Sequence, residues 1–162
     1  MSTTVSARPA VVGSVDPRGP QVAAAITSVV LAAVLLLPQP VAGVLLGVQA
    51  VVFALGAVRG VQHAPYAWVF RRLVRPRLQP PADLEDPTPP RFAQVVGLAF
   101  ALVGLVGFAA GVTTLGLVAT GLALVAALLN AVFGLCLGCE LYLLLRRGLD
   151  SARPTTTTRP NP

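Results

Sequence analysis

The chain has 162 residues, of which 55% are hydrophobic and only 11% are charged, and its mean hydropathy is +0.78. This composition excludes an ordinary soluble domain and a disordered chain, because both carry more polar residues. The basic residues that give the net charge of +6 lie outside the apolar stretches, where they can meet anionic lipid headgroups. We therefore expect a lipid bilayer around the protein and no nucleic acid as a partner.

The arginines fall into three clusters, which lie before Gln21, between Arg59 and Arg91, and after Leu145. Arginine marks the cytoplasmic side of bacterial membrane proteins. The clustering therefore predicts a multi-pass protein of the bacterial inner membrane, with four spans and with the N and C termini cytoplasmic. Outside the clusters the apolar stretches and their short connectors carry one charge, that of Glu140.

The apolar stretches predict an all-α fold, an integral membrane four-helix bundle made of two tandem helical hairpins. The spans are expected at about 20–37 and 41–58 in the first hairpin, and at about 92–110 and 115–145 in the second. The last run is about half as long again as a membrane requires, so it must tilt, break or emerge. These spans lie within one membrane domain, 15–149, and the tails 1–14 and 150–162 are expected to be disordered.

The two hairpins resemble each other in sequence. Asp16-Pro17-Arg18-Gly19-Pro20 before the first span matches Asp86-Pro87-Thr88-Pro89-Pro90 before the third, at an offset of 70 residues. A second similarity joins Val52-Phe53-Ala54-Leu55 to Val132-Phe133-Gly134-Leu135. These matches predict a tandem duplication, with the copies related by a pseudo-two-fold axis along the membrane normal.

Small and polar residues recur inside the spans. Glycines spaced four apart favour close helix packing, and the pairs are Gly43/Gly47, Gly56/Gly60, Gly107/Gly111 and Gly134/Gly138. The polar residues at membrane depth are Gln49, Thr120, Asn130 and Glu140. We expect the first three to form hydrogen bonds between helices, and the alternative is a polar pathway.

The connector between the hairpins contains a predicted interfacial amphipathic helix over 65–75. Its apolar residues Tyr66, Val69, Phe70, Leu73 and Val74 follow helical spacing, and Arg71, Arg72 and Arg75 lie on the other face. We expect these aromatic residues and the flanking Trp68 at headgroup depth, with the arginines on lipid phosphates. Docking of a partner protein is the alternative interpretation.

The fourth apolar run ends in a Cys-x-x-Cys pair, Cys136 and Cys139, beside Glu140. On one continuous helix Cys136, Cys139, Glu140, Leu143 and Arg147 would share one stripe. Three interpretations stay open: a packing surface, a dithiol that exchanges with a soluble carrier, or two thiolate ligands of a metal. Zinc would need two more ligands, for which His63 and Glu140 are the only obvious candidates, and no cofactor is expected.

Electrostatics separates the first two interpretations. In an unbroken helix the thiols lie near a helix C-terminus and a carboxylate, both of which oppose thiolate formation. If the helix breaks at Gly134 or Gly138, the pair lies at the N-terminus of a short new helix, whose dipole favours a thiolate.

The stretch from Val15 to Arg147 resembles a family of bacterial four-span membrane proteins known as domain of unknown function 4395. The resemblance lies in four strings: Val15-Asp-Pro-Arg-Gly-Pro, Phe70-Arg-Arg-Leu-Val-Arg-Pro-Arg-Leu, Glu85-Asp-Pro-x-Pro-Pro-Arg-Phe-Ala-Gln and Gly134-x-Cys-Leu-Gly-Cys-Glu-x-Tyr. No established activity comes with it. The resemblance implies soluble thioredoxin-like or rhodanese-type sulfurtransferase proteins as partners.

These observations lead to three functional hypotheses. The first is a membrane component whose candidate thiols, Cys136 and Cys139, are tuned by Glu140 and serve such a soluble partner. The second is a small transporter or channel, a homo-oligomer in which Gln49, Asn130 and Glu140 line a path. The third is a structural assembly protein. An enzyme is not indicated, because the sequence has no Ser-His-Asp set, phosphate loop or carboxylate pair.

Overall fold

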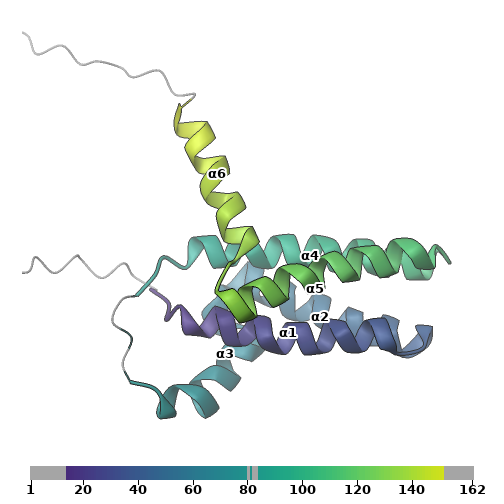
Figure 1. Cartoon of the computed structure of the whole chain (residues 1–162), viewed down its shortest axis with the longest axis horizontal. Coiled ribbons are helices and arrows are strands. Elements are labelled where there is room, and N and C mark those ends of the chain that lie inside the picture. The colour runs from purple at the N-terminus through teal and green to yellow at the C-terminus, as the bar shows by residue number, and fades with distance from the viewer. Residues whose placement is uncertain (1–13, 80, 82–83, 152–162) are drawn as a thin grey trace, which may run out of the picture.

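The computed structural model describes residues 14–79, 81 and 84–151 as an all-α bundle (Figure 1). Its long helices are α1 (Arg18–Leu36), α2 (Gln39–Arg59), α4 (Thr88–Ala109) and α5 (Thr113–Phe133). Each is long and apolar enough to cross a membrane, so the chain is a multi-pass membrane protein of two hairpins, as predicted. The predicted disordered tails lie, apart from residues 14, 150 and 151, outside the described residues.

The four long helices pack mainly between the hairpins, α1 against α5 and α2 against α4. The centre is filled by the side chains of Leu31, Val34, Ala42, Leu46, Ala50, Phe53, Ala101 and Ala123. The starts of α1 and α4 and the ends of α2 and α5 share one end of the bundle (Figure 1). We call it the arginine end, because it carries Arg18, Arg59 and Arg91, and the opposite end is the turn end.

The duplication is visible in the backbone at the start of each copy. Helix α1 begins at Arg18 and α4 begins at Thr88, 70 residues later. The residues just before them at the same offset, Val15 and Glu85, form an antiparallel bridge in which each N–H donates to the other's carbonyl at 2.9 Å. Such a reciprocal contact between equivalent residues is what a two-fold axis between the copies produces.

Equivalent side chains also make equivalent contacts across the hairpins. The Gln21 amide of α1 donates to the Ala131 carbonyl of α5 at 3.2 Å. Its counterpart Arg91 of α4 donates to the Ala57 carbonyl of α2 at 2.5 Å. Ala57 and Ala131 are 74 residues apart, as are the first residues of α2 and α5. The similarity of Val52 to Val132, at an offset of 80, therefore does not reflect the duplication.

The apolar run 115–145 is broken, which is one of the three outcomes that its excess length predicted. Helix α5 ends at Phe133, and Gly134 follows in the left-handed conformation with φ 68°. Without a Cβ, glycine adopts this conformation readily, and its N–H donates to the Asn130 carbonyl at 3.0 Å. A new helix, α6 (Leu137–Ser151), then packs against α4 and runs across the long axis of the bundle (Figure 1).

The predicted connector helix is present but irregular. It comprises α3 (Pro65–Val69), a π-helical turn over Phe70–Val74 and a 3₁₀ turn over Arg75–Arg77, after a 3₁₀ turn at Val61–His63. It lies on the start of α1, where Phe70 contacts Gly19. In the second copy α6 lies in the same way on the start of α4, where the rings of Phe92 and Tyr142 are 5.6 Å apart. Each copy is thus two spans followed by an amphipathic helix.

The predicted glycine contacts hold at some positions and fail at others. A Cβ on Gly107 of α4 would lie 2.6 Å from the backbone nitrogen of Gly116 of α5, so these two helices touch backbone to backbone. A Cβ on Gly138 of α6 would lie 2.6 Å from the Cα of Ala93. Gly43 and Gly47 have nothing within 4 Å, so this pair does not pack helices within the chain.

Replacement of Asp86 with alanine should destabilise the protein at neutral pH by up to about 1 kcal/mol, the size of an N-terminal capping interaction. Hydrogen bonds from the hydroxyl of Thr88 (2.6 Å) and then from its N–H (2.8 Å) lower the pKa of Asp86. A lowered pKa stabilises the fold above the ordinary carboxyl pKa, and this advantage disappears as pH falls through the lowered value. Thermal unfolding of both proteins in detergent from neutral to acidic pH should show their difference shrinking.

Candidate functional site

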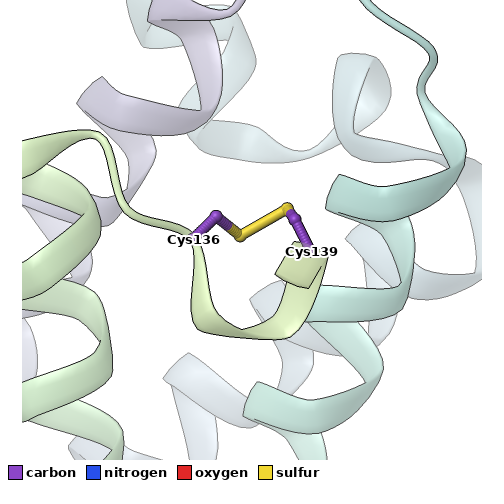
Figure 2. The surroundings of a disulfide bond; sticks show 2 residues. All are labelled: Cys136 and Cys139. Carbon is purple, nitrogen blue, oxygen red and sulfur yellow. A yellow bond between two sulfur atoms is a disulfide. The ribbon is translucent and has the colours of Figure 1, made fainter. Parts of the chain in front are cut away.

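Cys136 and Cys139 are joined by a disulfide bond, with their Cα atoms 5.2 Å apart. Figure 2 shows the bond linking the loop before α6 to the first turn of that helix. The Cys136 carbonyl accepts a hydrogen bond from the Glu140 N–H at 3.0 Å, at the start of α6. Both cysteines are half-buried. They lie at the arginine end, because only Gly134 and Leu135 separate Cys136 from Phe133, the last residue of α5.

The break at Gly134 decides the electrostatics of the pair. Cys136 immediately precedes α6 and Cys139 is its third residue, so both lie where the first N–H groups of the helix have no partner within it. These N–H groups and the helix dipole favour a negative charge, here a thiolate in the reduced protein. Of the unbroken and the broken fourth helix, the broken one is therefore the arrangement that suits thiol chemistry. The stripe expected on one continuous helix is not required for it.

Glu140 lies outside the four long helices, and its depth in the membrane stays a prediction. It lies in the first turn of α6 and is exposed, and α6 is not one of the four helices suited to crossing a membrane. The break at Gly134 separates Glu140 from α5. The negative charge of Glu140 interacts favourably with the dipole at the helix N-terminus but repels a neighbouring thiolate. Because the carboxylate is exposed, solvent weakens this repulsion.

A cavity of about 390 Å³ lies beside the disulfide, lined by α1, α4, α5, the start of α6 and Phe53 of α2. Cys136 is part of its wall, whereas Cys139 is not among the lining residues. The wall is built mostly from small and apolar side chains, including Ala23, Ala93, Gly97, Ala126 and Ala127. Its uncharged polar residues are Thr27, Gln94 and Asn130. Sequence reasoning missed this cavity, because no pattern in the sequence shows that α5 leaves space beside α4.

The first copy has a smaller cavity of about 180 Å³ at α1 and α3, in the corresponding place. The Tyr66 hydroxyl donates to the buried amide of Gln49 at 2.7 Å, and that amide donates to the Thr27 hydroxyl at 3.5 Å. Burial raises the pKa of Tyr66, which keeps its hydroxyl protonated as a donor. Gln49 therefore joins two helices, as predicted for it, whereas the Thr120 hydroxyl donates to the Gly116 carbonyl of its own helix at 2.8 Å.

The predicted interface residues divide into two groups. The hydroxyl of Tyr66 reaches inward to Gln49 and Phe70 is buried, while their position at headgroup depth stays a prediction. Trp68 is 54% exposed, and the guanidinium of Arg72 lies 5.4 Å from its ring centroid. Arg71, Arg72 and Arg75 are exposed as expected. A second helix of this kind, α6, was missed, although Leu145-Arg146-Arg147 resembles Phe70-Arg71-Arg72.

The residues of the predicted polar path do not come together. Gln49 is buried in the bundle, Asn130 lines the larger cavity and Glu140 is exposed on α6. Leu31, Leu46 and Val34 fill the space between the long helices. The arrangement of one chain therefore does not support a transport path through its centre.

The metal interpretation is not supported by the part of the chain that the structure describes. Within residues 14–79, 81 and 84–151 no three His, Cys, Asp or Glu side chains are grouped to hold a metal ion. Cys136, Cys139 and His63 are therefore not assembled as ligands. Nδ1 of His63 lies 2.9 Å from the Arg59 carbonyl oxygen, to which a protonated Nδ1 donates.

Comparison with known proteins identifies a family and nothing finer. The family model described as Domain of unknown function (DUF4395) matches residues 15–147. This range begins at the bridge residue Val15 and ends within α6, so it includes both copies and the disulfide. No curated protein and no solved structure matches the chain.

Proposed function

This chain belongs to the DUF4395 family, and we propose that it is a thiol–disulfide protein of the bacterial inner membrane. The observation that carries the proposal is the Cys136–Cys139 disulfide at the N-terminus of α6. A pair held at a helix N-terminus can alternate between a disulfide and a dithiol, because the thiolate needed for exchange is favoured there.

The proposed reaction is disulfide exchange with a soluble dithiol protein of the thioredoxin-like or sulfurtransferase class. A thiolate of the partner attacks the sulfur of Cys139, and Cys136 leaves as a thiolate. The partner's second thiolate then breaks the mixed disulfide, which leaves the partner oxidised and Cys136 and Cys139 reduced. Two electrons therefore pass from the partner to the membrane protein in each cycle. The partner class is the one that the resemblance to the family implies.

The arginine distribution supports cytoplasmic access for this exchange. Arg18, Arg59 and Arg91 lie at the same end of the bundle as the cysteines, and arginine is retained on the cytoplasmic side. On α6 itself Arg146 and Arg147 are exposed beside the site. They provide positive charge for anionic lipid or for an acidic partner surface.

Alkylation with a membrane-impermeant maleimide in sealed inverted vesicles tests this function. We expect labelling of both cysteines after reduction with dithiothreitol and none without reduction, because the disulfide blocks both sulfurs. Right-side-out vesicles should label only after detergent is added. Cysteines that react in neither vesicle, even after reduction, until detergent is present would be packing residues, and the proposal would fail.

A further inference from the structure

We propose that the larger cavity binds a lipid-soluble quinone, which oxidises the Cys136–Cys139 dithiol to the disulfide. This inference rests on the proposed function and names the second reactant that the cycle needs. Exchange with a soluble dithiol leaves the pair reduced, so a two-electron acceptor must restore the disulfide before the next cycle. The geometry of the cavity points to an acceptor that arrives from the lipid.

The cavity reaches from the arginine end into the membrane-spanning part of the bundle. Cys136 and Pro20 line its outer part, and Thr27 of α1 and Leu122 of α5 line its inner part. Leu122 and Val125 also form the outer surface of α5, where they are 54% and 53% exposed. Large apolar side chains exposed on a spanning helix contact lipid tails. A ligand dissolved in the bilayer therefore meets residues of the cavity wall directly.

The chemistry of the wall favours a neutral, largely apolar ligand with hydrogen-bond acceptors. No lining residue is charged, so an ionic ligand would be buried without a counter-ion. Phe53 and Phe100 offer aromatic rings, and the amides of Gln94 and Asn130 offer N–H donors suited to carbonyl oxygens. The volume lies in the range of small-molecule sites. A quinone ring with its two carbonyl groups meets these requirements.

The oxidation step balances on the two sulfurs and the two quinone oxygens. Two S–H bonds break and one S–S bond forms between Cys136 and Cys139. The two electrons and two protons pass to the quinone, which leaves as a quinol. Only Cys136 lines the cavity, so its sulfur is the one that reacts with the quinone, whereas Cys139 exchanges with the soluble dithiol.

The difference between the two copies supports a specialised site. In the first copy Tyr66 reaches inward to Gln49 and Phe70 is buried, and the cavity beside them has a volume of about 180 Å³. In the second copy Ala123 stands at the position equivalent to Gln49, by the offset that relates α2 to α5. The larger cavity has most of its wall in α4, α5 and α6, so it lies against the copy that carries the cysteines.

The test is quinone reduction by the purified, dithiothreitol-reduced protein in lipid nanodiscs, with a decyl-substituted benzoquinone as the probe. We expect one quinol for each cysteine pair, measured by ultraviolet absorbance, together with loss of both thiols. Replacing Ala126 with phenylalanine fills the cavity and should slow the reaction by about tenfold or more, as for a loss of ligand affinity. The matched control Ala25→Phe lies exposed on α1, away from the cavity, and should leave the rate unchanged.

Two outcomes would overturn the inference. Equal rates for Ala126→Phe and Ala25→Phe would place the reaction outside the cavity, and absence of quinol formation would exclude the quinone altogether. If the reduced protein still reacts with a maleimide and its disulfide still exchanges with a reduced thioredoxin, the thiol function survives and only the quinone is excluded. If neither reaction occurs, the proposed function fails as well.

Discussion

Replacing Gly107 with valine is expected to destabilise the bundle by about 3 kcal/mol, at the upper end of the usual cost of overpacking. A Cβ at this position would lie 2.6 Å from the backbone nitrogen of Gly116 and 3.1 Å from its Cα. A backbone cannot rotate away as a side chain can, so α4 and α5 must separate. Unfolding in detergent, followed by circular dichroism, measures the effect.

A matched control distinguishes helix separation from a general effect of valine in a membrane helix. Gly47 also lies within a spanning helix, α2, but has nothing within 4 Å of a built Cβ. Gly47→Val should change the stability by less than about 1 kcal/mol, the range of helix propensities. Similar losses from both substitutions would show that α4 and α5 are not in backbone contact.

Replacing both Cys136 and Cys139 with serine is expected to abolish disulfide exchange while leaving the bundle folded. The disulfide joins residues three apart in sequence, and the core residues lie elsewhere, in α1, α2, α4 and α5. Oxidation of a reduced thioredoxin by the membrane protein, measured through the loss of its free thiols, should fall to the uncatalysed level. The single variant Cys136→Ser cannot form the intramolecular disulfide, so it should likewise leave the thioredoxin thiols unchanged.

The phenotype of cells that carry the double serine variant separates the proposed function from a structural role. A protein that serves only in assembly would keep its cellular phenotype when both thiols are lost. Loss of the phenotype in the double serine variant, with normal protein level and normal unfolding, would tie the biological role to the cysteines.

Sequence reasoning predicted the first three spans well because each is a long apolar run that begins at proline or arginine. The fourth run continues beyond Phe133, where neither residue marks the end of α5. Pro38 and Pro89 lie at the helix boundaries, since proline suits the ends of helices and not their interiors. The Asp-Pro repeat correctly placed the two copies, because Asp16 and Asp86 each accept the N–H of the first residue of a helix.

The site was harder to predict because it depends on a backbone break and on packing. Hydropathy continues through Gly134, so the sequence alone left both an unbroken and a broken fourth helix open. The direction of the α6 dipole and the exposure of Glu140 follow only once the break is known. The cavity depends on how α5 lies against α4, which hydrophobic periodicity does not determine.

The packing of each hairpin mainly against the other has a consequence for biosynthesis. The first hairpin leaves the ribosome before α4 and α5 exist, yet α1 and α2 have their main contacts with those later helices. Its two helices must therefore wait in the bilayer as a loosely associated pair, and folding is completed only after the second hairpin is inserted. Helix α6 and its cysteines follow the second hairpin, so a chain whose translation stops before Cys139 lacks the thiol pair.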